Sequence, residues 1–143
     1  MQRKLIGLAT TAVLLASCQT KDVFEPGWER AIGQMDPSHA TVQAVSAPAT
    51  ATVNVPFSVT VRTLGSSICT RVANTEVSVT GLTVTVTPYD EYARTMPYCT
   101  NDQKAFEHTA SVTVASPGTA TIRVSARSLQ GVPINIDRVV TVQ

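Results

Sequence analysis

From Ala40 onward, apolar and polar residues alternate at every second position, and this pattern constrains the fold more than any other feature. In one such run, Val53, Val55, Phe57, Val59 and Val61 share one face and polar residues or proline fill the other. A strand with one buried face produces such a pattern, because successive side chains point to opposite sides. The chain also has 21 threonines and 20 valines, β-branched residues that suit a pleated sheet. We therefore predict an all-β protein.

The same alternation recurs and predicts about seven short strands within residues 40–143. Residues 77–79 alternate in one phase and residues 82–86 in the other, so we expect a bend, bulge or tight turn near Gly81. Residues 88–104 have no period and are expected to form the longest loop. Clean two-faced strands favour two antiparallel sheets packed face to face.

Three stretches resemble bacterial immunoglobulin-like domains. Ala49–Val61 looks like the second strand of that family, Ser116–Arg127 like its penultimate strand, and Val139–Val142 like its last. The resemblance covers most of residues 40–143 and implies an immunoglobulin-like antiparallel β-sandwich. It implies a fold and leaves the function open, because one fold carries many functions.

The first eighteen residues predict where the protein is located. A basic head at residues 3–4 precedes the apolar segment Leu5–Ala16, which is too short to span a bilayer but suits a signal-peptide core. The motif Leu15-Ala16-Ser17-Cys18 resembles the lipobox of bacterial lipoproteins. The resemblance implies that residues 1–17 are a signal peptide, that cleavage precedes Cys18, and that the thiol is lipidated.

Residues 18–39 have no strong period and are expected to be a lipidated tether before an immunoglobulin-like domain at 40–143. The lipoproteins that Gram-negative bacteria hold at the inner membrane typically have Asp directly after the lipidated cysteine. Here Gln19 occupies that position, so an outer-membrane anchor is favoured if the cell is Gram-negative. Trp28 and Ile32 either dock on the domain or belong to a contact surface, and one helical turn is expected around them.

The net charge of the chain limits the classes of partner that we expect it to bind. Without residues 1–17 the chain has 9 basic and 10 acidic residues, because Arg3 and Lys4 are removed. A formal charge of −1 argues against nucleic acid and against polybasic membrane binding. The partners expected are the membrane, through the lipid on Cys18, and an envelope protein or glycan. No cofactor is expected.

Two cysteines remain in the expected domain, Cys69 and Cys99. An exported chain enters an oxidising compartment, so the pair predicts a disulfide, with two unpaired buried thiols as the alternative. Such a bond would clamp the long loop and would not join the sheets across the core.

All three tyrosines lie within ten residues of one another, and an arginine and a methionine lie among them. These residue types are enriched at interfaces, and tyrosine offers a large contact area at little entropic cost. We predict a partner-binding loop, with packing over the sandwich edge as the alternative. Its residues are Tyr89, Tyr92, Arg94, Met96 and Tyr98.

No motif in the chain predicts catalysis or a metal site. The two histidines, His39 and His108, have no His or Cys at metal-ligand spacing and are expected to be exposed to solvent. Asp90, Glu91 and Asp102 could supply oxygen ligands for calcium, but solvated loop acids are the better interpretation.

These observations predict a lipid-anchored, non-catalytic binding or structural module of the cell envelope that contacts a protein or a glycan. One alternative is a subunit of an envelope assembly that pairs through a strand edge. Another is a small exported hydrolase that uses His108 as a general base.

Overall fold

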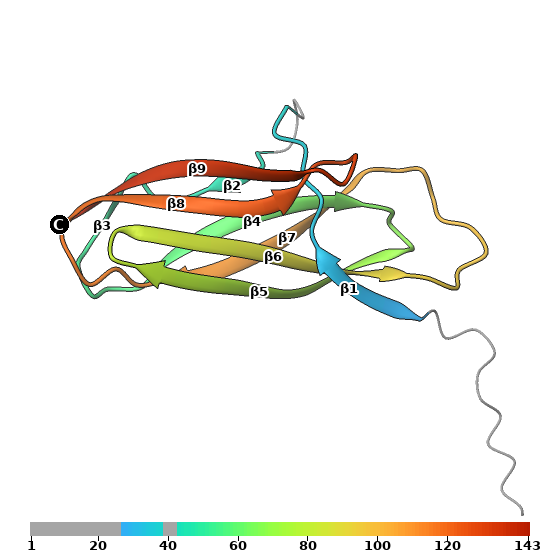
Figure 1. Ribbon diagram of the computed structural model, residues 1–143, viewed down its shortest axis with the longest axis horizontal. Coiled ribbons are helices and arrows are strands. Elements are labelled where there is room, and N and C mark those ends of the chain that lie inside the picture. Colours follow the sequence, from blue (N-terminus) through green and yellow to red (C-terminus); the bar gives the residue numbers. More distant parts are fainter. Residues whose placement is uncertain (1–26, 39–42) are drawn as a thin grey trace, which may run out of the picture.

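The computed structural model describes residues 27–38 and 43–143, which form two sheets packed face to face (Figure 1). These two ranges contain no helix, and so none there that could cross a membrane. The prediction of an all-β sandwich is confirmed, whereas residues 1–17, Cys18 and His39 lie outside the described residues. The strands are β1 (Trp28–Ile32), β2 (Val45–Ser46), β3 (Thr50–Ala51), β4 (Phe57–Gly65), β5 (Thr70–Thr80), β6 (Thr83–Ala93), β7 (Lys104–Val112), β8 (Gly118–Arg127) and β9 (Pro133–Val142).

The larger sheet has six strands and is built around β6. β6 pairs with β5 from Thr83 to Tyr92, with one shift of register. On its other side β6 pairs with β8 through Thr83–Val86 and with β1 through Tyr89–Ala93. The sheet continues through β9 to β3. Two of these pairings, β6 with β8 and β3 with β9, are parallel, so the expected antiparallel arrangement holds for most of the sheet but not all of it.

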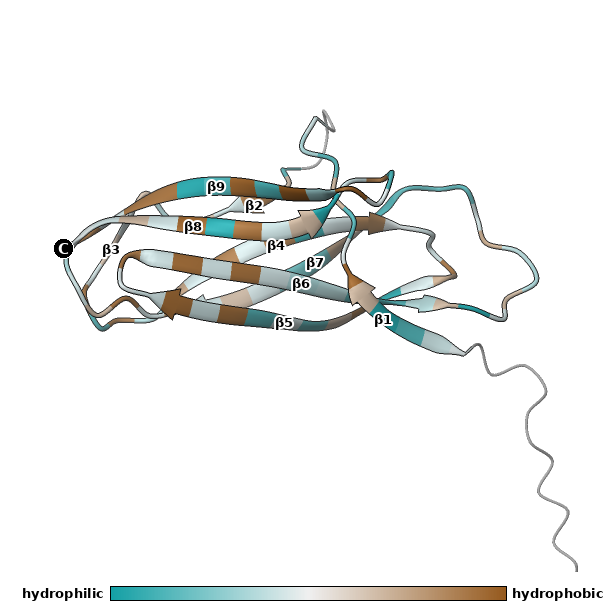
Figure 2. Cartoon of the chain, in the orientation of Figure 1, coloured by the Kyte–Doolittle hydropathy of each residue, from teal (hydrophilic) through white to brown (hydrophobic). Residues whose placement is uncertain are grey.

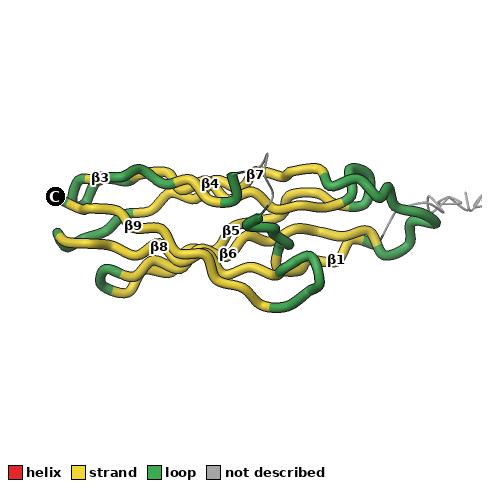
Figure 3. Tube along the Cα trace, turned by 90° about the horizontal axis from the view of Figure 1, so that it is seen from above, coloured by secondary structure: helices red, strands yellow, loops and turns green. Residues whose placement is uncertain are grey.

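The smaller sheet has three strands, in the order β2, β4, β7. Strands β4 and β7 pair antiparallel over nine residues without a break, from Phe57 opposite Val112 to Gly65 opposite Lys104. The core lies between the two layers (Figure 3), and alternating hydropathy is visible along β5, β8 and the first half of β6 in Figure 2. The fully buried valines include Val59, Val61, Val84, Val86, Val112, Val124 and Val140.

Trp28–Ile32 form strand β1, and the expected helical turn is wrong. Each of these residues lies opposite one of Tyr89–Ala93 of β6, and Gly33 N then donates to Pro88 O at 2.9 Å. Pairing with a neighbouring strand therefore overrides the weak local preference of the segment. It follows that the sheet begins within the segment that was expected to be a tether.

Strand β6 continues to Ala93, so the first part of the expected loop 88–104 is strand. The alternation disappears there because the inward positions carry Pro88, Asp90 and Tyr92 in place of valine, while the backbone pairing persists. The loop that remains spans residues 94–103.

Two turns, at Gly81 and at Asn54, decide where neighbouring strands end or begin. Thr80 lies opposite Thr83, and Gly81 adopts φ +59°, so the expected tight turn is confirmed. The strand expected from Val53 begins only at Phe57, because Asn54 has φ 60° and turns the chain. Val55 is consequently 51% exposed instead of sharing the buried face.

Candidate functional site

A disulfide joins Cys69 and Cys99, with an S–S distance of 2.08 Å and a Cα–Cα distance of 5.6 Å. Cys69 ends the turn 66–69 between β4 and β5, and Cys99 lies in the loop 94–103. The bond thus ties a loop to a turn at one end of the sandwich, as predicted, and does not join the sheets across the core.

The first half of the loop is held against the start of the described chain. Gly27 N donates to Thr95 Oγ1 at 2.9 Å, and Arg94 N donates to Gly27 O at 2.8 Å. The Arg94 guanidinium also pairs with Glu29, which raises the pKa of Arg94. Met96, which follows, is half-buried.

The second half of the loop is held against the turn 66–69. The Ser66 and Thr100 hydroxyls lie 2.8 Å apart, and Ser67 N donates to Asp102 Oδ1 at 3.1 Å. Hydrogen bonds from the Thr100 hydroxyl and from Ser67 lower the pKa of Asp102 to about 2. The loop is therefore ordered on both sides of the disulfide. We call Gly27, the turn 66–69 and the loop 94–103 together the disulfide end.

The three tyrosines do not form one surface. Tyr89 lies on β6 beneath the guanidinium of Arg30, whose Cζ is 3.5 Å from the ring centroid. Tyr92 points inward from the same strand; burial and the nearby Asp90 raise its pKa to about 12. Tyr98 lies in the loop and is 73% exposed. The prediction of a single tyrosine loop is wrong for Tyr89 and Tyr92, because they belong to a strand whose side chains alternate between faces.

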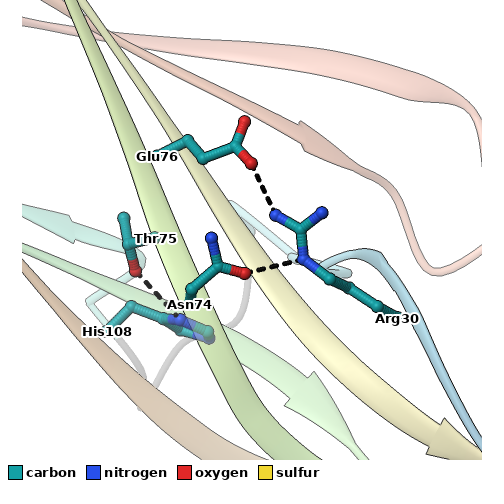
Figure 4. A network of polar contacts seen from close by, with 5 residues as sticks. All are labelled: Arg30, Asn74, Thr75, Glu76 and His108. Carbon is teal, nitrogen blue, oxygen red and sulfur yellow. Dashed lines mark hydrogen bonds and ion pairs between the residues drawn. The ribbon is translucent and has the colours of Figure 1, made fainter.

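His108 is 2% exposed and lies between the sheets, so the expectation of a solvent-exposed histidine is wrong. Its Nε2 is 3.0 Å from Asp90 Oδ1 and 3.1 Å from Thr63 Oγ1. Its Nδ1 is 3.3 Å from Thr75 Oγ1, a contact drawn in Figure 4. The position of His108 was readable from the sequence, because it shares the parity of the buried Ala110 and Val112.

Asp90 is also fully buried, which corrects its interpretation as a solvated loop acid. Its Oδ1 meets His108, and its Oδ2 has no hydrogen-bond partner in the structure. Both ring nitrogens of His108 have side-chain partners and both side chains are enclosed, so a substrate could reach them only if the sheets separated. The hydrolase alternative therefore lacks geometric support at this site.

The three acids considered for calcium lie in different surroundings. Asp90 meets His108, Glu91 pairs with Arg71 at 2.5 Å, and Asp102 accepts from Ser67. Within residues 27–38 and 43–143, no three His, Cys, Asp or Glu side chains are grouped to hold a metal ion.

On the outer face, a second polar cluster joins β1 to β5. The Arg30 guanidinium donates to Asn74 Oδ1 and to Glu76 Oε1, each at 2.6 Å (Figure 4). This ion pair lowers the pKa of Glu76. The register of β5 against β6 shifts between Val72 and Thr75, which brings the Asn74 side chain to Arg30. The cluster is fully paired and exposed, so it joins strands without presenting a free charge.

Strand β5 forms the edge of the larger sheet. In the part of the chain that the structure describes, β5 pairs only with β6 over its eleven residues. Val77 and Val79 lie opposite the buried Val86 and Val84, so they face the inner side of the sheet, yet they are 38% and 44% exposed. The narrower sheet of three strands does not cover them. We call Val77–Thr80 with its free backbone edge the β5 edge.

One pocket of about 270 Å³ lies between residues 35–38 and 128–130, and it also includes Ile134. None of the residues selected from the sequence lines it. Comparison of the chain with family models, curated proteins and solved structures found no match.

Proposed function

We propose that this protein is a lipid-anchored, non-catalytic module of the bacterial envelope that binds an extended strand of another protein at the β5 edge. The lipobox-like motif ending in Cys18 supports the anchor, and Gln19 favours the outer membrane in a Gram-negative cell. The observation that carries the binding role is the long edge strand with exposed valines on its inner face.

The two flanks of the sandwich differ in how their edges are protected. On one flank the outermost strands are β2 and β3, which have two residues each. Because β3 pairs only with Thr141 and Val142, the described residues leave Pro133–Val140 of β9 without a partner on this flank, but this stretch carries a proline, Pro133, and a charge on its inner side, Arg138 opposite the buried Ile122. On the other flank the sheets end in β5, with eleven residues, and β7, with nine. Short edge strands are a common protection against pairing, whereas long ones offer a row of backbone donors and acceptors. The second flank is thus the side that can accept a strand.

The chemistry of the β5 edge favours a peptide as its occupant. Edge strands are usually guarded by inward charges, by lysine or by proline. Val77–Thr80 contain none of these and read Val-Ser-Val-Thr. A strand added beside them would satisfy the open backbone groups and cover Val77 and Val79, as in β-augmentation.

Cross-linking the lipoprotein in its own membrane, followed by mass spectrometry, tests this role. Val79→Lys places a charge on the β5 edge and is expected to abolish the cross-linked adduct. Val139→Lys is the matched control, because Val139 is 61% exposed on β9 and lies off this edge. An adduct that survives Val79→Lys, or that both variants remove equally, would contradict the role of the edge.

The anchor is tested separately by cell fractionation. We expect Cys18→Ala to move the protein from the membrane to the soluble fraction, because the acyl chains provide the attachment. Continued membrane association of that variant would contradict the anchor.

A further inference from the structure

Two exposed apolar side chains flank the disulfide. Ile68 is 40% exposed and Tyr98 is 73% exposed. Each directly precedes one cysteine of the Cys69–Cys99 bond, whose Cα atoms are 5.6 Å apart. The bond therefore holds both side chains at one end of the molecule, on segments that are ordered by the hydrogen bonds described above.

The chain joins the domain at this same end. Gly27 exchanges hydrogen bonds with Arg94 and Thr95 of the loop, and the C-terminus lies at the opposite end of the sandwich (Figure 1). Eight residues separate Gly27 from Cys18. Such a segment spans at most about 30 Å even when fully extended. If Cys18 is held in a membrane, the disulfide end is the part of the domain nearest to it.

The chemistry of the disulfide end suits a bilayer surface. The disulfide end holds one basic and one acidic residue, Arg94 and Asp102, so its formal charges cancel and little net charge opposes the approach. Tyrosine is enriched at membrane–water interfaces, where its ring is apolar and its hydroxyl remains hydrated. Because the loop is already ordered, the contact would lose little conformational entropy.

We propose that Ile68 and Tyr98 rest in the phospholipid headgroup region of the membrane that holds Cys18, so that the domain stands on the bilayer by its disulfide end. The proposal depends on the lipidation of Cys18 proposed above. In this orientation the β5 edge, next to the Gly81 turn at the far end, points away from the membrane toward its partner.

Fluorescence quenching by lipid tests the proposal. Trp28 is the single tryptophan of the chain, so Trp28→Phe gives a silent background. In that background, Tyr98→Trp and the matched control Val55→Trp are introduced into the full lipoprotein, which is reconstituted in phosphatidylcholine vesicles with brominated acyl chains. Val55 is 51% exposed, and its turn lies at the C-terminal end, where Val53 N donates to Gln143 O. We expect Tyr98→Trp to lose most of its fluorescence and Val55→Trp to lose little.

Equal quenching at both positions would overturn the proposal, since it would mean that the domain has no preferred end toward the membrane. Ile68→Trp provides a second reporter if Tyr98→Trp disturbs the fold. Flotation of the wild-type protein with the vesicles separates the two proposals. Failure to float removes the anchor and this inference together, whereas flotation without the difference in quenching removes only this inference.

Discussion

His108 and Asp90 show how a single pair of residues connects the two sheets. His108 lies on β7 of the smaller sheet and Asp90 on β6 of the larger one, and both side chains are enclosed. The isolated sequence positions suggested surface residues. Burial of the His108 ring and of Asp90 Oδ1 is tolerated here because they are partners for each other, with Thr63 and Thr75 completing the contacts of the ring.

We expect His108→Ala to lower the free energy of unfolding by about 3 kcal/mol or more, because it leaves the Asp90 carboxyl buried without its partner. Urea denaturation measures the change. The double variant with Asp90→Ala should lose less than the sum of the two single variants. Arg123→Ala, which breaks an exposed pair with Asp137, is the control and should have little effect. Additive losses would show that the two side chains do not act as a pair.

Because the pKa of Tyr92 is raised by folding, we expect the folded protein to lose stability in alkali. That pKa is raised from 10 to about 12 in the folded protein, so the folded state holds the phenol proton more tightly than the unfolded state. This contribution is fully present below pH 10 and is lost as the pH rises to about 12. Denaturant unfolding across that range should show the decline in the wild type and in Tyr98→Phe, and a weaker decline in Tyr92→Phe. Identical profiles for all three proteins would argue against it.

At the scale of elements, β6 is the strand on which the larger sheet depends, because β1, β5 and β8 all pair with it. Its apolar half was recognisable from the alternation of Val84 and Val86. Its polar half was not, because the inward Asp90 and Tyr92 break the hydrophobic period. Those residues become inward only through partners that lie far away in the sequence.

The disulfide is expected to stabilise the loop more than the sheets. Replacing both cysteines with serine should lower the free energy of unfolding by about 3–4 kcal/mol for a separation of 30 residues. Hydrogen exchange should become faster in the turn 66–69 and the loop 94–103, while β4 and β7 remain protected. Equal loss of protection in β4 and β7 would indicate that the bond also supports the core.

At the scale of the whole molecule, the two ends of the sandwich differ from each other, and so do its two flanks. One end carries the disulfide, the ordered loop and the point where the described chain begins, and the other carries the C-terminus (Figure 1). One flank carries two-residue strands and the stretch of β9 that includes Pro133 and the inward Arg138, and the other exposes the long strand β5. A module attached at one end with an open flank is suited to act by position and contact, which agrees with the proposed role.

The sequence by itself determined the strands that have an apolar face, because the period of two follows from local backbone geometry and the burial of one face. It also determined the Gly81 turn and the Cys69–Cys99 pair. Only the tertiary structure decided that Trp28–Ile32 is a strand, that Asp90 is buried beside His108, and that Tyr98 is the tyrosine most exposed to solvent. These outcomes depend on hydrogen bonds and packing between residues far apart in the chain, which no local pattern encodes.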